Sequence, residues 1–395
     1  MRMAASQSRR YGQPVLVAPV LRVCRFLLRH DPSEGPNIWA LVFTCLAALA
    51  AIAAHAGAND WNVNALRRIA NPPLGLPRLA LAKRNEPNAE RIGLGRKLFF
   101  DPRLSGNSSM SCASCHVPEQ GFTQNDRLTP KGVDGRSIRR NAPSLLNIGY
   151  YRFLMWDGGA PSLQSQILTP LFGPHEMANP TFKGLLERLQ KLPDYEGRFE
   201  KVFGAPATVP QIGRAIASYE VSLVSANSAF DRWYYGGESG ALGADAQRGF
   251  RLFTAKAGCS ECHRIDARAA LFTDQDFHDT GVSFLAAQVH TEDLDDRGRQ
   301  QVTSELADVH KFKTPTLRNV ALTAPYMHNG SLRSLEEVIR YYNNGGSADP
   351  SKDPKVHPLG LTEDEIRDLV AFLESLNGDN LESLIAEARE AKDGN

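Results

Sequence analysis

The chain has 395 residues, of which 42% are hydrophobic and 23% charged, so an ordinary globular core is within its reach. Its formal net charge is +1 and it contains no long basic run, which excludes nucleic acid as an expected partner. Length alone favours two or three domains.

The N-terminal stretch has the pattern of an export signal. Residues 38–56 are apolar and uncharged, arginines precede them, and Ala54-His55-Ala56 is typical of a signal-peptidase cleavage site. We therefore expect residues 1–56 to be a signal peptide. An uncleaved membrane anchor is the alternative, because the run is close to the lower length limit for a span. In both cases we expect a periplasmic protein.

The next feature is a helix followed by a short cysteine motif. Asn88 is a suitable cap for a helix that runs to about Phe100 with an apolar face. After a Gly/Ser/Asn-rich loop the chain reads Ser111-Cys112-Ala113-Ser114-Cys115-His116. Residues 244–254 predict a second helix of this kind, and Gly258-Cys259-Ser260-Glu261-Cys262-His263 follows it. The sequence therefore contains an internal repeat of helix, loop and Cys-x-x-Cys-His.

Two cysteines followed at once by histidine are typical of covalent haem c attachment. Each thiol adds to one vinyl group of the porphyrin, and the adjacent imidazole reaches the iron as proximal ligand. A zinc site of four thiolates, or a disulfide pair, is the alternative, but neither explains the histidine after each pair. We therefore expect two haem c groups, held by Cys112, Cys115 and His116 and by Cys259, Cys262 and His263.

The rest of the chain predicts helices and long loops. Helical patterns cover residues 181–192 and 209–223, and Thr362 with Glu365 forms a capping box that opens a helix near the C-terminus. A polar, Gly-rich stretch at 225–243 marks a boundary. We expect a mainly α protein with little β-structure, built from two cytochrome c-like haem domains with long loops. Their ranges are 57–235 for the N-terminal domain and 236–395 for the C-terminal one.

The chain resembles the bacterial di-haem cytochrome c peroxidases and their MauG-type relatives over roughly residues 85–380. Besides the two haem motifs, the resemblance depends on five blocks of sequence. They are Leu94-Gly95-Arg96-Lys97-Leu98-Phe99-Phe100-Asp101, Arg140-Asn141-Ala142-Pro143-Ser144, Trp156-Asp157-Gly158, Thr314-Pro315-Thr316-Leu317-Arg318-Asn319 and Ala324-Pro325-Tyr326-Met327-His328-Asn329-Gly330.

For the first haem, the resemblance implies the place where peroxide reacts. Residues 117–154 contain no His, Met or Cys, and the position of the histidine that blocks the iron in many family peroxidases matches Gly132. Lys131 is a poor substitute, so we expect an open or water-bound iron. Gln166 and Glu176 match the distal catalytic pair. Without the resemblance they would be interpreted as a helix-face residue and a surface acid.

Between the haems, Trp156 matches an indole that relays electrons in the family, although a packed core Trp is the plain alternative. The resemblance also implies a calcium ion held by Asn141 and by the backbone carbonyls of Thr323 and Pro325. Oxygen ligands of this kind suit calcium.

For the second haem, the residue opposite His263 distinguishes the subtypes. The peroxidases use a Met where this chain has Tyr342, and MauG-type enzymes use a Tyr there. Tyr342 lies on the apolar face of the predicted helix after Ser334. A buried core Tyr is the alternative, and Met327 is the second candidate ligand.

Three functions compete. The first is a di-haem peroxidase that reduces hydrogen peroxide with electrons from a small c-type cytochrome or cupredoxin. The second is a MauG-type enzyme that oxidises residues of a partner protein. The third is a non-catalytic di-haem electron carrier, against which Gln166 and Glu176 argue. The peroxidases that the chain resembles are usually homodimers.

Overall fold

The computed structural model describes residues 61–81, 86–284 and 296–393, with gaps at 82–85 and 285–295. Residues 62–395 form one compact unit, and everything below concerns that unit. The predicted signal peptide or anchor at 1–56 lies outside the described residues. Within the described ranges, no helix has both the length and the apolar character needed to cross a membrane.

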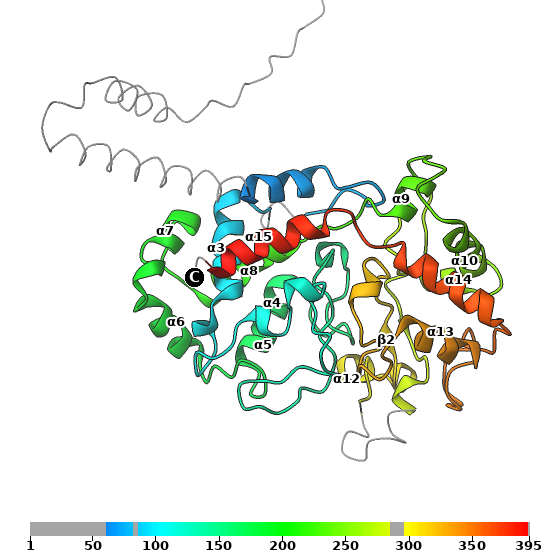
Figure 1. Ribbon diagram of the computed structural model, residues 1–395. Coiled ribbons are helices and arrows are strands. Elements are labelled where there is room, and N and C mark those ends of the chain that lie inside the picture. The colour runs from blue at the N-terminus through cyan, green and yellow to red at the C-terminus, as the bar shows by residue number, and fades with distance from the viewer. Residues whose placement is uncertain (1–60, 82–85, 285–295, 394–395) are drawn as a thin grey trace, which may run out of the picture. The chain divides into compact units, whose positions relative to one another are not determined.

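The unit is mainly α with little strand, as predicted (Figure 1). The two short strands β1 (Phe277–His278) and β2 (Phe312–Lys313) pair antiparallel. The helices are α3 (Ala89–Phe100), α4 (Leu163–Gln166), α5 (Leu168–Phe172), α6 (Phe182–Gln190), α7 (Arg198–Phe203), α8 (Val209–Val221), α9 (Ala229–Tyr234), α10 (Ala244–Thr254), α12 (Gln300–Thr303), α13 (Leu335–Asn343), α14 (Glu363–Glu374) and α15 (Leu381–Asp393).

Local sequence explains where the main helices begin. The Asn88 side chain accepts a hydrogen bond from the amide of Arg91 and so caps α3, as predicted. Thr362 and Glu365 form the predicted capping box of α14. The helix predicted over 209–223 ends at Val221, where Ser222 caps it. The helix predicted over 181–192 is the shorter α6.

Each haem motif follows a helix that packs very closely on a partner helix. In α3, a Cβ at Gly95 would lie 1.9 Å from the carbonyl oxygen of Ala215 in α8. In α10, a Cβ at Gly249 would lie 1.9 Å from the carbonyl oxygen of Asp368 in α14. Only glycine permits these backbone approaches. The two helix pairs, α3 with α8 and α10 with α14, thus form equivalent scaffolds for the two motifs.

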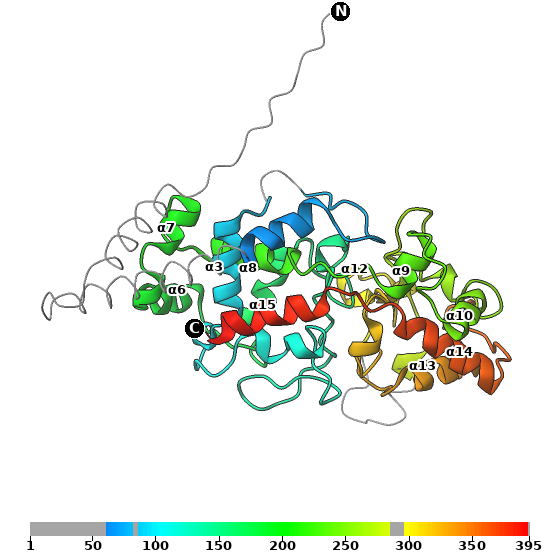
Figure 2. The same ribbon diagram turned by 45° about the horizontal axis from the view of Figure 1, so that its top comes forward.

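The buried apolar residues form two main clusters, one on each scaffold. The first contains residues of α3 and α8, and the second contains residues of α10 and α14. The C-terminal helix α15 belongs to the first cluster through Leu384 and Ala388. Figures 1 and 2 both show α15 beside α3 and α8, after the chain has passed through α14. The C-terminal end of the chain therefore returns to the first hydrophobic cluster. The domain boundary at 235/236 stays a prediction.

A second internal repeat follows each haem motif. An isolated β-bridge joins Leu154 to Ala160, and an equivalent one joins Tyr326 to Leu332. Left-handed backbone occurs at matching places inside the two bridges, at Met155 and Gly158 and at Met327 and Gly330. A serine then caps a helix in each half, Ser162 for α4 and Ser334 for α13. Because the sequence spacing between these pairs is constant, residues of the two halves can be matched by position.

Candidate functional site

Both Cys-x-x-Cys-His motifs have the same backbone form. The cysteine pairs lie in the 3-10 turns η3 (Cys112–Ser114) and η7 (Cys259–Glu261). The amide of His116 donates to the carbonyl of Cys112 at 3.0 Å, and that of His263 to the carbonyl of Cys259 at 2.9 Å. All four cysteines are free thiols, as attachment to two haems requires.

The two histidines are held by the same kind of hydrogen bond. Nδ1 of His116 lies 3.1 Å from the carbonyl oxygen of Phe122, and Nδ1 of His263 lies 2.8 Å from that of Phe272. Burial lowers the pKa of His116 to about 4 and lowers that of His263 as well. Each ring is therefore neutral, with Nδ1–H donating to the carbonyl and the Nε2 lone pair available to iron.

Sequence reasoning missed these carbonyl partners. Phe122 and Phe272 are fully buried, and both have left-handed backbone, with φ of 57° and 51°. Such backbone is uncommon for an aromatic residue. Phe122 follows His116 by six residues and Phe272 follows His263 by nine, so the spacing in the sequence did not mark them as equivalent.

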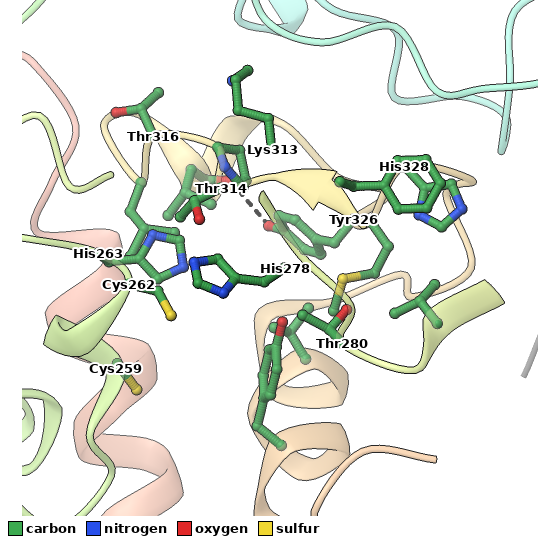
Figure 3. Close-up of a pocket in the computed structure, with 18 of the residues that line it drawn as sticks. Cys259, Cys262, His263, His278, Thr280, Lys313, Thr314, Thr316, Tyr326 and His328 are labelled. Atoms are coloured by element: carbon green, nitrogen blue, oxygen red, sulfur yellow. Dashed lines mark hydrogen bonds between the residues drawn. The ribbon is translucent and has the colours of Figure 1, made fainter. Parts of the chain in front are cut away.

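A cavity of about 300 Å³ opens beside the second motif. Cys259, Cys262 and His263 line it, together with apolar side chains of α13 and α14 and residues of the first half such as Trp156. Figure 3 shows this cavity with the cysteines and His263 on one wall. Free thiols, a neutral imidazole and an apolar lining are what covalent haem c needs, so these residues fit the group.

The two candidate ligands opposite His263 both line this cavity. Tyr342, on α13, and Met327, in the preceding loop, are among its lining residues. The neighbouring Tyr341 is not, and its hydroxyl donates to the carbonyl of Thr280 at 2.8 Å. Burial, the largest cause, raises the pKa of Tyr342. The geometry thus places both candidates on the cavity wall without choosing between them.

Gln166 ends α4 and Glu176 follows α5. The amide nitrogen of Gln166 donates to the sulfur of Met155 at 3.5 Å. Burial raises the pKa of Glu176, and the charge of its carboxylate contributes, after burial, to the raised pKa of Cys115. Glu176 is only partly buried, and no side-chain hydrogen bond to it is formed within the described residues.

The internal repeat identifies what replaces Tyr342 in the first half. Counting from the matched caps Ser162 and Ser334, the counterpart of Tyr342 in α13 is Pro170 in α5. A proline side chain has no atom that can bind iron. The first site therefore has no residue equivalent to the candidate ligand of the second.

The loop around Gly132 lies against the segment that carries Glu176. A Cβ at Gly132 would overlap the carbonyl oxygen of His175, and the amide of Val133 donates to the carbonyl of Glu176 at 2.9 Å. Lys131 is exposed, and exposed His175 pairs with Asp134 at 3.0 Å. This loop thus supports the backbone at Glu176, and both basic side chains face solvent.

Trp156 and Asn141 lie where the two halves meet. The indole Nε1 donates to the carbonyl of Asn141 at 2.8 Å, and the amide of Asn141 donates to the carbonyl of His328 at 2.7 Å. His328, the repeat counterpart of Trp156, is buried and stacks on Phe312 at 3.7 Å. Asn141, Thr323 and Pro325, the residues predicted to bind calcium, all line the same cavity.

Two further cavity residues were not singled out from the sequence. His278 has its ring nitrogens 2.9 Å from a carboxylate oxygen of Asp274 and 2.6 Å from one of Asp353. Figure 3 shows its ring facing His263. Lys313, in β2, is buried beside the cavity. The short β1–β2 pair brings both of them to the cavity wall.

Known proteins share these features. Residues 89–239 match the profile of the family described as di-haem cytochrome c peroxidase, and residues 246–377 match that of cytochrome c. The chain is 40% identical over 332 residues to the methylamine utilization protein MauG of Methylorubrum extorquens, which covers 83% of this chain and 89% of that protein. It is 39% identical over 333 residues to the cytochrome-c peroxidase IdrP1 of Denitromonas iodatirespirans, covering 78% and 86% of the two chains.

Among solved structures, a MauG-like protein associated with microbial copper homeostasis matches with a TM-score of 0.69 and 32% identity. That match covers 79% of this chain and 96% of the other. Together with the two haem sites, these matches show that the chain belongs to the di-haem cytochrome c peroxidase and MauG family and is an oxidoreductase with two covalently bound haem c groups.

Proposed function

We propose that the protein reduces hydrogen peroxide at the haem held by Cys112, Cys115 and His116. The observation that carries this proposal is Pro170 at the repeat position of Tyr342. The first site lacks the ligand candidate that the second has, and Gln166 and Glu176 match the family's distal catalytic pair. An open coordination position beside an acid–base group is the arrangement that peroxide chemistry needs.

Haem iron held by Cys112, Cys115 and His116 would supply the redox chemistry for reducing hydrogen peroxide to two water molecules, a reaction that consumes two electrons and two protons. Glu176 takes a proton from one peroxide oxygen and returns it to the other, and its electrostatic effect on Cys115 supports a place near the haem attachment site. The amide of Gln166 orients the peroxide by hydrogen bonding.

A haem held by Cys259, Cys262 and His263 would supply the point of electron entry, and Trp156 would relay electrons from it to the first site. The indole of Trp156 donates to the carbonyl of Asn141 in the first half, and Trp156 also lines the cavity beside the second haem motif. This position supports the proposed route. We infer that Tyr342 would hold the second haem together with His263, with Met327 as the second candidate. A phenolate stabilises ferric iron more than a thioether does.

A calcium ion at the junction, held by Asn141 and the carbonyls of Thr323 and Pro325, is part of the proposal. The side-chain nitrogen Nδ2 of Asn141 donates to the carbonyl of Leu128 at 3.0 Å, which leaves the side-chain oxygen Oδ1 for another partner. All three residues line the same cavity, which supports a calcium site there.

The electron donor we propose is a small c-type cytochrome or cupredoxin in the periplasm, and the enzyme acts as a homodimer. Relatives named cytochrome c peroxidases support this class of donor. Export to the periplasm is supported by the sequence pattern of residues 1–56.

A second function is MauG-type oxidation of residues in a partner protein. The specific observation that favours it is Tyr342 on the cavity wall, where the family's MauG-type members have a tyrosine. The identity to a MauG protein supports it too.

Rapid mixing of the holoprotein with peroxide, followed by reduced c-type cytochrome, tests the proposal. Sustained oxidation of the cytochrome supports the peroxidase. A fast spectral change with peroxide but no sustained turnover supports the MauG-type enzyme. A holoprotein whose spectrum does not respond to peroxide contradicts both.

A further inference from the structure

Lys313 is a buried cation on the wall of the haem cavity. Its side chain is 8% exposed, and its nitrogen lies 3.7 Å from the centre of the Tyr151 ring. Its backbone amide donates to the carbonyl of Trp156 at 2.8 Å, which fixes the residue at the junction of the two halves. Burial alone lowers the pKa of Lys313 to about 7. The ammonium form therefore lacks stabilising charge in the chain itself.

The contrast with other cations of the cavity is informative. Arg318 also lines it and is fully buried, but its guanidinium pairs with Asp231 at 2.8 Å. Lys355 lines it and is exposed to solvent. Among the described residues, no carboxylate forms an ion pair with Lys313. The cation–π contact with Tyr151 offsets only part of the desolvation of a buried ammonium. An anion beside Lys313 would stabilise its charged form.

The cofactor brings suitable anions. Haem c carries two propionate carboxylates on the edge of the ring opposite the vinyl groups, and Cys259 and Cys262 hold the vinyl edge. Figure 3 shows these cysteines on one side of His263 and Lys313 on the other. We propose that Lys313 is the counter-ion of a propionate of the haem attached to Cys259 and Cys262.

Replacing the charge tests this assignment. Lys313→Met keeps the apolar stem and removes the cation, and Lys311→Met is the matched control, because Lys311 lies on the same segment and pairs with Asp308 at 3.4 Å. Loss of a positive charge disfavours the reduced haem. In spectroelectrochemistry we expect Lys313→Met to lower the midpoint potential of the second haem and Lys311→Met to leave it unchanged. Infrared spectra with ¹³C-labelled propionates should show a shifted carboxylate band in Lys313→Met alone.

A conservative variant covers the case in which Lys313→Met carries fewer than two haems. Lys313→Arg keeps the charge, so a wild-type potential and a wild-type propionate band in this variant support the assignment. The assignment is overturned if Lys313→Met leaves both signals unchanged, if only the first haem's potential moves, or if Lys313→Arg behaves like Lys313→Met.

Discussion

The indole nitrogen of Trp156 donates a 2.8 Å hydrogen bond to the backbone carbonyl of Asn141. This bond fixes the orientation of the ring, because the carbonyl belongs to a loop that is itself bonded to the second half through His328. These hydrogen bonds therefore restrain the indole of Trp156 at the junction of the two halves.

Trp156→Phe should slow electron transfer between the haems, by roughly tenfold, because the indole both shortens the path and is more easily oxidised than a phenyl ring. Both haems should remain attached. The measurement is the rate at which the half-reduced protein responds to peroxide in rapid mixing. Trp233→Phe is the control, since Trp233 packs in the second core away from the junction. Equal rates in both variants would argue against a relay at Trp156.

Glu176→Gln should reduce peroxide turnover by about 10²–10⁴-fold, the usual contribution of a general acid–base group. The haem spectrum before peroxide should be unchanged, because Glu176 is not an iron ligand in the proposal. Glu187→Gln, which changes an exposed carboxylate on α6, is the control. Near-normal turnover in Glu176→Gln would remove this residue from the mechanism.

The pH profile gives a second test of Glu176. Burial raises its pKa, so the carboxylate that accepts the peroxide proton is lost at a higher pH than for an ordinary glutamate. The second-order rate constant for peroxide should therefore fall as the pH decreases through this raised pKa. In Glu176→Gln the acid limb of the profile should disappear. An acid limb that persists unchanged in the variant would assign it to another group.

Tyr342→Phe should alter the spectrum of the second haem, because it removes the phenolic oxygen that we propose as ligand. The midpoint potential should rise, since the oxygen ligand stabilises the ferric state. Met327→Leu is the matched variant and should leave the oxidised spectrum unchanged. The opposite pattern, with a Met–iron charge-transfer band that Met327→Leu abolishes, would assign the ligand to Met327.

The features that the sequence predicted are those whose chemistry depends on residue type. The spacing of the cysteines identified both attachment sites. Capping residues, followed by apolar residues at helical spacing, located α3 and α14. The partners of the proximal histidines could not be found in this way, because the carbonyls of Phe122 and Phe272 are backbone atoms that every residue has.

Gln166, Glu176, Trp156 and Asn141 were predicted only through the resemblance to the family. Lys313 was not predicted. Lysine is usually exposed, so its type gives no reason to place it in a cavity. Its burial follows from the pairing of β1 with β2, strands too short to show an alternating pattern. The match of Pro170 to Tyr342 likewise needed the backbone, because it depends on left-handed residues and bridges rather than on similar side chains.

Gly249→Ala should destabilise the second haem domain by about 3 kcal/mol, because the new methyl group would overlap the backbone of Asp368 and force α10 away from α14. Gly240→Ala is the control, since a Cβ at Gly240 meets no atom within 4 Å. Urea unfolding followed by the haem absorbance of each variant measures the difference. Equal midpoints would show that the two helices can separate at little cost.

Glu220, on α8, should make the stability of the protein depend on pH. Its side chain is buried, and one carboxylate oxygen has no hydrogen-bond partner among the described residues. Burial raises its pKa from 4.5 to about 8. Between these values the folded protein keeps a proton that the unfolded chain releases, so the free energy of unfolding falls as pH rises from 4.5 through 8. Glu220→Gln resembles the protonated acid and cannot ionise, so it should abolish this decline.

The variant and the wild type should therefore be equally stable below pH 4.5, and above pH 8 the variant should be more stable by about 5 kcal/mol. Urea unfolding at several pH values across this window measures the difference. Glu200→Gln, at an exposed position on α7, should follow the wild type at every pH. A difference between Glu220→Gln and the wild type that stays constant with pH would mean that Glu220 is ionised in the folded protein, held by a partner that the chain's own described residues do not supply.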